Sequence, residues 1–260
     1  MKKVSKAVLS AALLATLAGC SSKSEDTSLK DVQASGELKI GLEGDWQPFS
    51  YHDKDDNLVG YDVEVATKVA EKLGVKAVIT EGPWDGLLTG LDTGVYDVVV
   101  NGVDVTPERS ETFDFTDAYA YDHIDLVVKK ENTAITSFED LKGKKSANST
   151  GSTYAEMGEE YGATVSNVPT LAETMELVLN GTVDATINAD TSIQDYLNTT
   201  GEKGLKIVAQ DDEATEYAIP VKKGNTSLKE AINDALKELR EEGTLKELSL
   251  KYFGADLTEK

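Results

Sequence analysis

Charged and polar side chains at three places in the sequence could together bind a small molecule that carries a carboxylate and an ammonium group. Arg109 has a guanidinium group, whose planar fork of donors meets two carboxylate oxygens at once and stays charged at any working pH. Ser152 and Thr153 lie at the start of a predicted helix, where exposed N–H groups attract an anion. Asp190 follows a predicted strand at residues 185–187, and ligands of open α/β sheets bind outside such strand ends. We therefore expect the first three residues to bind the carboxylate and Asp190 to bind the ammonium group.

Each of these residues also has an ordinary structural role, which the sequence leaves open. Arg109 could form a surface ion pair with Glu108 or Glu111. Asp190 could cap a helix that begins near Thr191, and the serine and threonine could cap the helix that they precede. Capping and ligand binding are compatible at both helix starts.

The chain has two tryptophans, Trp46 and Trp84. A tryptophan at the rim of a cleft offers a flat apolar wall and a face for cation–π contact. Packing in the core is the alternative explanation for either ring. Trp46 follows Asp45 in a predicted loop before Pro48, which favours a position in a cleft.

The elements that must position these residues alternate between strands and helices. The predicted strands cover residues 38–42, 75–79, 98–100, 144–148 and 185–187. The predicted helices cover residues 61–73, 86–93, 138–143, 153–161, 170–180, 227–240 and 245–252. This alternation predicts an α/β fold with parallel-rich sheets flanked by helices and joined by right-handed crossovers.

Two further β-rich stretches, residues 125–129 and 217–222, are predicted to cross between two lobes. A chain that leaves one lobe near residue 127 and returns near residue 219 makes the first lobe discontinuous and the second an insertion. The expected organisation is a signal segment at 1–20, a flexible tether at 21–35, a first lobe at 36–127 and 219–260, and a second lobe at 128–218.

The first twenty residues have the pattern of an export signal. Three lysines within the first six residues precede an apolar stretch at 7–18, which is too short to span a bilayer stably. The run 17–20, Leu-Ala-Gly-Cys, resembles the lipobox of bacterial lipoproteins, in which the thiol of the cysteine is diacylated. We therefore expect Cys20 to be lipidated, and an ordinary signal with an accidental cysteine is the alternative.

Composition excludes several classes of partner and site. The chain has 47 acidic and 26 basic residues and a formal net charge of −21, so nucleic acids and anionic membrane surfaces would repel it. Cys20 is the single cysteine, which rules out an intramolecular disulfide and a multi-cysteine metal site. We expect no metal and no cofactor.

Short motifs in a fixed order give the chain a family resemblance. They lie at residues 38–42, 48–49, 59–63, 101–109, 113–116, 140–144, 183–185, 243–245 and 252–254. From Gly36 to the C-terminus the chain resembles the polar amino-acid-binding proteins of ABC importers, the bacterial extracellular solute-binding proteins of family 3. The resemblance implies a two-lobed periplasmic-binding-protein fold of type II, with two crossing hinge segments and a cleft that closes on a free amino acid.

The resemblance also implies roles for individual residues. Arg109 falls where the family places its carboxylate-binding arginine, and the backbone N–H of Gly102 should assist it. Glu43 stands where relatives often carry an acidic contact residue, and the two tryptophans stand where relatives place rings beside the ligand. Asp104 stands where many relatives have threonine, so it could bind the ammonium group or the ligand side chain.

The amino acid itself is less constrained. Glu43, Asp104 and Asp190 would make the cleft acidic, which disfavours a glutamate-like ligand and admits a cationic one such as arginine, lysine or histidine. The runs 101–109 and 119–121, however, resemble members that bind cystine, cysteine or other small polar amino acids. Cystine or cysteine is the favoured expectation, with cationic amino acids as the alternative.

Two other classes use the same fold. One is an enzyme resembling cyclohexadienyl dehydratase, and the other is a surface adhesin or sensor. No Ser/His/Asp order and no glycine-rich phosphate loop stands out, so a non-enzymatic binding protein is expected. The expected partners are a free amino acid, an ABC permease and, through Cys20, the bacterial cell membrane, either at the cell surface or in the periplasm. A monomer is expected.

Overall fold

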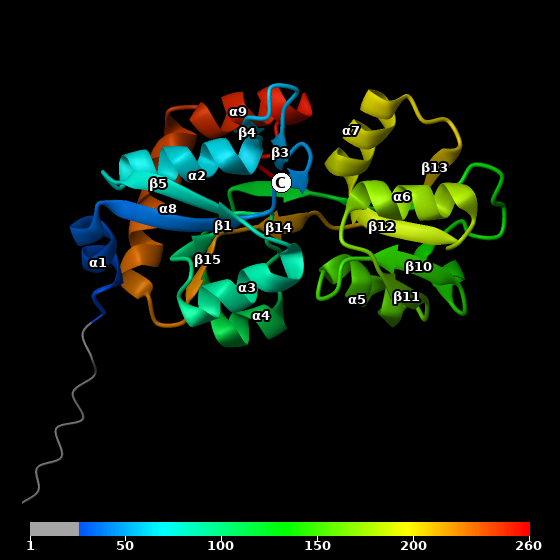
Figure 1. Ribbon diagram of the computed structural model, residues 1–260, viewed down its shortest axis with the longest axis horizontal. Helices are drawn as coiled ribbons and strands as arrows, with labels where there is room; N and C mark the ends of the chain where they lie inside the picture. The colour runs from blue at the N-terminus through cyan, green and yellow to red at the C-terminus, as the bar shows by residue number, and fades with distance from the viewer. Residues whose placement is uncertain (1–25) are drawn as a thin grey trace, which may run out of the picture.

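The computed structural model describes residues 26–260. The predicted signal segment, the lipidation site Cys20 and residues 21–25 of the predicted tether lie outside the described residues. The described chain forms two α/β lobes that lie side by side, each built around its own five-stranded sheet (Figure 1). We call them lobe 1 and lobe 2.

Lobe 1 contains the sheet with strand order β5-β1-β6-β15-β7. Its strands are β1 (Glu37–Leu42), β5 (Lys76–Glu81), β6 (Val98–Val99), β7 (Phe113–Phe115) and β15 (Pro220–Lys222). Its helices are α1 (Ser28–Ser35), α2 (Tyr61–Lys72), α3 (Trp84–Thr93), α4 (Pro107–Thr112), α8 (Thr226–Glu241) and α9 (Thr244–Phe253). β1 pairs in parallel with β5 and β6, as the alternating pattern predicts.

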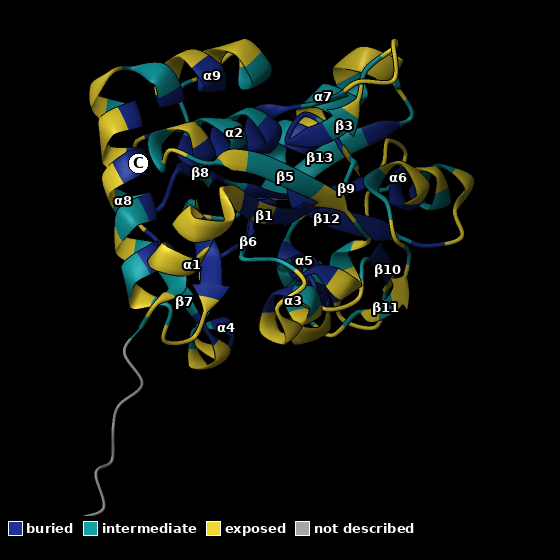
Figure 2. Ribbon diagram, turned by 60° about the vertical axis from the view of Figure 1, so that its left-hand side comes forward, coloured by how far each residue is buried: buried dark blue, intermediate teal, exposed yellow. Residues whose placement is uncertain are grey.

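Helical spacing of apolar residues explains how the helices cover this sheet. In α8, Leu228, Ile232, Leu236 and Leu239 are buried along one stripe, and the helix packs against α2 and α9. Figure 2 shows the same division along the chain, with buried inner faces and exposed outer faces on the helices. The sequence therefore determines which face of α8 meets the core.

Lobe 2 contains the sheet with strand order β11-β10-β12-β9-β13. Its strands are β9 (Ile124–Lys129), β10 (Lys145–Asn148), β11 (Thr164–Asn167), β12 (Ala185–Ala189) and β13 (Leu205–Gln210). Its helices are α5 (Thr153–Glu160), α6 (Leu171–Asn180), α7 (Asp190–Thr200) and the 3₁₀ helix η1 (Phe138–Leu141). The five residues of β12 are all buried, because helices cover both faces of this central strand.

Two segments connect the lobes and pair with each other. They are β8 (Ala120–Asp122) and β14 (Thr215–Tyr217), which are antiparallel. β9 follows β8 into lobe 2, and β15 follows β14 into lobe 1. Each of these entering strands is antiparallel to both neighbours in its sheet, so both sheets are mixed rather than purely parallel.

The structure corrects two boundaries. The boundary predicted at residue 127 falls inside β9, and the whole of β9 belongs to the sheet of lobe 2, so the chain crosses before Ile124. Residues 28–35, predicted as part of a flexible tether, form α1. This helix is held to lobe 1, where the Oγ atoms of Ser28 and Ser227 lie 3.1 Å apart and Asp26 accepts a hydrogen bond from the backbone N–H of Ser227.

Candidate functional site

A pocket lies between the lobes. The residues of lobe 1 that line it are Glu43, Asp45, Trp46, Trp84, Asn101, Gly102 and Asp104. Those of lobe 2 are Ser149, Ser152, Thr153, Tyr154, Pro169, Thr170, Leu171 and Asn188. All of the predicted site residues except Arg109 and Asp190 therefore line one pocket that both lobes build.

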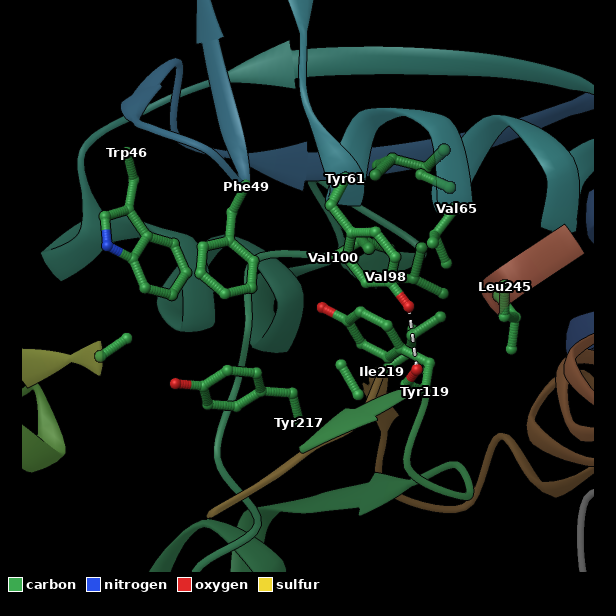
Figure 3. Packing of buried hydrophobic residues seen from close by; sticks show 14 of the residues in the cluster. Trp46, Phe49, Tyr61, Val65, Val98, Val100, Tyr119, Tyr217, Ile219 and Leu245 are labelled. Atoms are coloured by element: carbon green, nitrogen blue, oxygen red, sulfur yellow. Dashed lines mark hydrogen bonds between the residues drawn. The ribbon is translucent and has the colours of Figure 1, made fainter. Parts of the chain in front are cut away.

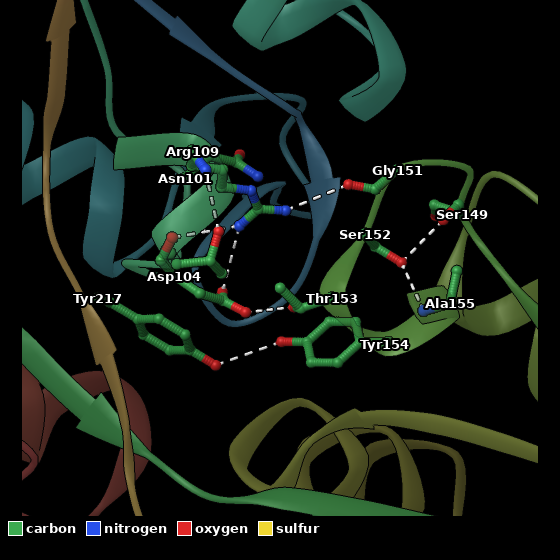
Figure 4. Close-up of polar contacts among 12 residues, drawn as sticks. Asn101, Asp104, Arg109, Ser149, Gly151, Ser152, Thr153, Tyr154, Ala155 and Tyr217 are labelled. Carbon is green, nitrogen blue, oxygen red and sulfur yellow. Dashed lines mark hydrogen bonds and ion pairs between the residues drawn. The ribbon is translucent and has the colours of Figure 1, made fainter. Parts of the chain in front are cut away.

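Arg109 lies directly behind this pocket, on the short helix α4. Its side chain is only 8% exposed, and its guanidinium lies over the ring of Trp84, 5.2 Å from the ring centroid. Nη1 donates to the backbone oxygen of Asp104 at 3.2 Å, and Nη2 donates to that of Gly151 in lobe 2 at 3.1 Å (Figure 4). Its ion-pair partner among the described residues is Asp104, at 4.0 Å, so the surface pair with Glu108 or Glu111 is not formed.

Asp104 joins this guanidinium to the first turn of α5. The hydroxyl of Thr153 donates to one carboxylate oxygen of Asp104, across the two lobes. Burial raises the pKa of Asp104, while Arg109 and the Thr153 hydroxyl oppose that rise by stabilising the charged form. The carboxylate of Asp104 therefore faces both the guanidinium of Arg109 and the N-terminus of α5.

The first turn of α5 is capped by its own sequence. The Oγ atom of Ser152 accepts from the backbone N–H of Ala155 at 3.1 Å and donates to the backbone oxygen of Ser149 at 2.7 Å. Ser152 is thus an N-cap that also lines the pocket, and the two roles are compatible, as predicted. Beside it, the hydroxyls of Tyr154 and Tyr217 lie 3.2 Å apart and link α5 to the connecting strand β14 (Figure 4).

Glu43 is held at the opposite wall of the pocket. Its carboxylate accepts from Nδ2 of Asn101 at 2.8 Å, and its own backbone N–H donates to Oδ1 of the same asparagine at 2.7 Å. Burial raises the pKa of Glu43 to about 7, against the hydrogen bond from Asn101. The net negative charge that Glu43 brings to the pocket therefore changes near neutral pH.

Trp46 is a fixed wall of the pocket rather than a mobile rim residue. It belongs to β2 (Asp45–Trp46), which pairs with β3 (Ser50–His52) and, through it, with β4 (Leu58–Val59). Its ring stacks on Phe49 at 4.2 Å between centroids, and its exposed fraction is 8% (Figure 3). Core packing and pocket lining, posed as alternatives from the sequence, are both true of this side chain.

The backbone N–H of Gly102 has a protein partner in this structure. It donates to the hydroxyl of Tyr119 at 3.0 Å, and that hydroxyl donates to Oδ1 of Asp62 at 2.8 Å. Asp62 is fully buried, and burial raises its pKa to about 7. The role predicted for this N–H, a direct bond to a ligand carboxylate, is therefore not supported in this arrangement.

Asp190 is placed outside the residues that line the pocket. It is the first residue of α7, and its carboxylate accepts from Nε2 of Gln194 at 3.2 Å. It lies beside Asp125, and burial followed by a hydrogen bond to Asp190 raises the pKa of Asp125 to about 7. The N-cap residue of α7 is Ala189, and Asp122 accepts from the backbone N–H and the hydroxyl of Thr191 in the first turn of this helix.

Sequence reasoning missed several lining residues, of which Asn188 and Asn101 are the most informative. Asn188 lies at the carboxyl end of β12, two residues before Asp190, and the rule that selected Asp190 applies equally to it. Asn101 follows β6 in the same way. Within residues 26–260 there is no cluster of histidine, cysteine and acidic side chains suited to a metal, and no helix is long and apolar enough to cross a membrane.

The chain forms two α/β lobes joined by paired crossing strands. A buried guanidinium and several carboxyl groups lie at the pocket between the lobes. These features define a two-lobed binding protein for a small charged molecule. The chain belongs to the bacterial extracellular solute-binding proteins of family 3, whose family model matches residues 38–255.

Known relatives agree with this membership. The chain is 38% identical over 268 residues to the L-cystine-binding protein TcyA of Bacillus subtilis (strain 168), covering 99% of this chain and 100% of that protein. Its structure is similar to the L-cystine solute receptor of Neisseria gonorrhoeae in the unliganded open conformation, with 39% identity, a TM-score of 0.60 and coverage of 90% and 99%. An ancestral arginine-binding protein bound to arginine gives 36% identity, a TM-score of 0.79 and coverage of 84% and 99%.

Proposed function

We propose that this chain binds one free amino acid between its lobes outside the cytoplasmic membrane and delivers it to an ABC permease. The observation that carries the proposal is the pocket itself, in which residues of both lobes bring a buried guanidinium, a helix N-terminus and carboxyl groups together. A zwitterion needs a matched group for each of its charges, because a buried unpaired charge is costly.

Arg109 and the first turn of α5 are proposed to bind the ligand carboxylate. Arg109 donates to two backbone oxygens here, so an entering carboxylate would replace at least the bond to Gly151. Asp104 and Glu43 are proposed to bind the ammonium group, since both line the pocket. The earlier assignment of the ammonium group to Asp190 has less support, because Asp190 does not line the pocket.

L-cystine is the proposed ligand. The curated relative and the Neisseria receptor both carry that ligand in their names. Cystine has two carboxylates and two ammonium groups, and the pocket presents acidic side chains on the walls formed by Glu43 and Asp104. Because the pKa of Glu43 is about 7, this wall accepts an ammonium group best at neutral to alkaline pH.

Arginine is the second candidate, on the strength of one observation. Glu43, Asp45 and Asp104 all line the pocket, and three carboxyl groups against one guanidinium favour a ligand with a net positive charge. Trp46 and Trp84 would give such a side chain flat apolar walls.

Lobe closure is proposed as the binding step. The side chains of Arg109, Trp46 and Asp104 each make hydrogen bonds to lobe 2, as a closed arrangement requires. The fold is also more similar to the arginine-bound relative than to the open receptor, although its sequence is slightly closer to the latter. A ligand that bridges the lobes would shift the population toward this state.

Lipid attachment at Cys20 is proposed as the means of retention outside the cell membrane. α1 begins eight residues after Cys20 and is held on the side of lobe 1 that faces away from lobe 2 (Figure 1). An anchor there would restrain the protein through lobe 1 and leave lobe 2 able to move.

A thermal-shift screen of the refolded protein tests the ligand class. Unfolding and refolding removes carried-over ligand, after which L-cystine, L-cysteine, L-arginine, L-histidine and L-glutamate are added singly. A bound amino acid raises the melting temperature by mass action. A shift with L-cystine supports the first candidate, and a shift with L-arginine alone supports the second. No shift with any amino acid, or turnover of prephenate, would overturn the proposal.

A further inference from the structure

Two aromatic neighbours, Phe49 and Tyr217 of the connecting strand β14, fix the ring of Trp46. Phe49 stacks on it at an interplanar angle of 12°, and Tyr217 meets it edge-on at 6.4 Å between centroids. Phe49 in turn meets the ring of Tyr217 at 5.7 Å, so the three rings brace one another (Figure 3). The indole can therefore present its N–H in only a narrow range of directions.

Gly102 supplies the space on the remaining side. A Cβ atom at this position would lie 2.6 Å from two atoms of the Trp46 ring, which is closer than real contacts allow. The φ angle of Gly102 is +49°, a region that side-chain-bearing residues rarely adopt. Since its N–H is already bonded to Tyr119, the contribution of Gly102 to the pocket is the room that it leaves for the indole.

Asn188 receives the indole N–H from lobe 2. Its Oδ1 atom accepts from Nε1 of Trp46 at 3.3 Å and also from the backbone N–H of Ala189 at 3.0 Å. The second bond holds the amide oxygen in place at the end of β12, and Asn188 is only 9% exposed. The acceptor is thus pre-oriented, and the bond joins the two lobes at the wall of the pocket.

We propose that Asn188 and Gly102 are positioning residues for Trp46: Gly102 makes room for the indole in lobe 1, and Asn188 holds its N–H from lobe 2 when the lobes close. This inference rests on the proposed function, because it assumes that closure accompanies ligand binding. In the open state the indole N–H meets water, so losing Asn188 penalises only the closed state. Ligand affinity therefore depends on a hydrogen bond between the two lobes.

A double-mutant cycle tests this on the full chain in mild detergent, by calorimetry with L-cystine or L-arginine, whichever binds the wild type. Asn188→Ala leaves a buried N–H without a partner in the closed state, so the Kd should rise about tenfold or more. Trp46→Phe removes that N–H and should raise the Kd by a smaller factor. Adding Asn188→Ala to Trp46→Phe should then cost less than about threefold, since no donor is left unpaired. A full tenfold further loss in the double variant would overturn the inference.

Two controls separate this role from a purely structural one. Asn148→Ala removes a hydrogen bond within lobe 2, from Nδ2 to the backbone oxygen of Ile187, and its effect should add independently to that of Trp46→Phe. The indole ¹H–¹⁵N signal of Trp46, assigned by its loss in Trp46→Phe, should be protected from solvent exchange when amino acid is bound. Asn188→Ala should reduce that protection at least tenfold, and unchanged protection would contradict the proposal.

The outcome for the inference is distinct from the outcome for the proposed function. If neither amino acid binds the wild type, the proposed function fails before the cycle begins. If an amino acid binds and the two substitutions act independently, only the positioning role fails. Gly102→Ala is a secondary test, since it should weaken binding by displacing the indole but could also disturb folding through its positive φ angle.

Discussion

Replacing Asp62 with asparagine should stabilise the protein at alkaline pH and have little effect at acidic pH. Asp62 lies in α2, is fully buried, and accepts a hydrogen bond from Tyr119 through Oδ1. Its Oδ2 atom has no hydrogen-bond partner among the described residues. The ionised form is therefore poorly solvated, whereas asparagine keeps the acceptor for Tyr119 and carries no charge.

The pKa of Asp62 gives the sign and the size of the effect. Burial raises it from 3.8 to about 7, so the folded state holds its proton to higher pH than the unfolded state does. The contribution of Asp62 to wild-type stability therefore falls as pH rises from about 4 to about 7, and stays at the lower level above that range. Each pH unit between the two pKa values is worth about 1.4 kcal/mol, so the advantage of Asp62→Asn should grow by about 3 kcal/mol between pH 5 and pH 8.

Urea unfolding of both proteins at pH 5, 6, 7 and 8 measures this difference directly. Asp122 and Asp125 also have pKa values raised to about 7, but they are present in both proteins and cancel in the comparison. Asp55→Asn, in an exposed turn, is the matched control and should follow the wild type. If the difference between Asp62→Asn and wild type changes by less than about 0.5 kcal/mol over this range, the reasoning is refuted.

Three further predictions concern the ligand, the core and the membrane. Arg109→Ala should raise the Kd of the bound amino acid about a hundredfold or more, because it removes a buried charge partner. Calorimetry that shows less than a tenfold rise would rule out a role of Arg109 in binding the ligand carboxylate. Leu236→Ala in α8 should lower the free energy of unfolding by about 2–5 kcal/mol, since Leu236 is fully buried; a loss below about 1 kcal/mol would show that α8 repacks. Cys20→Ser should move the exported protein from the membrane fraction to the soluble fraction, and continued membrane retention would exclude the lipid anchor.

Most of the helices and the central strands could be predicted from the sequence because their signals are local. The apolar spacing of α8 and the buried run at β6 depend only on which residues follow one another. The short strands β2, β3 and β4 were missed, since two or three residues carry no periodicity. α1 was missed because a helix of eight residues with one buried side chain has a weak amphipathic pattern, and its stability comes from contact with α8.

The candidate site, too, was predicted from the sequence only in part. The sequence identified residue types that a zwitterion requires, and Trp46, Trp84, Asp104 and Ser152, selected from the sequence and its family resemblance, line one pocket. It could not distinguish Asn188 from Asp190, because both follow the strand predicted at residues 185–187 and the direction of each side chain depends on where β12 ends and α7 begins.

Only the tertiary structure decided how these residues act together. Gly102 donates its N–H to a tyrosine and leaves room for an indole, and that indole bonds to an asparagine 142 residues further along the chain. The sequence determines local conformation through the spacing of apolar and capping residues. The contacts of the pocket arise between residues that are remote in sequence, and these depend on how two separately folded lobes are brought together by β8 and β14.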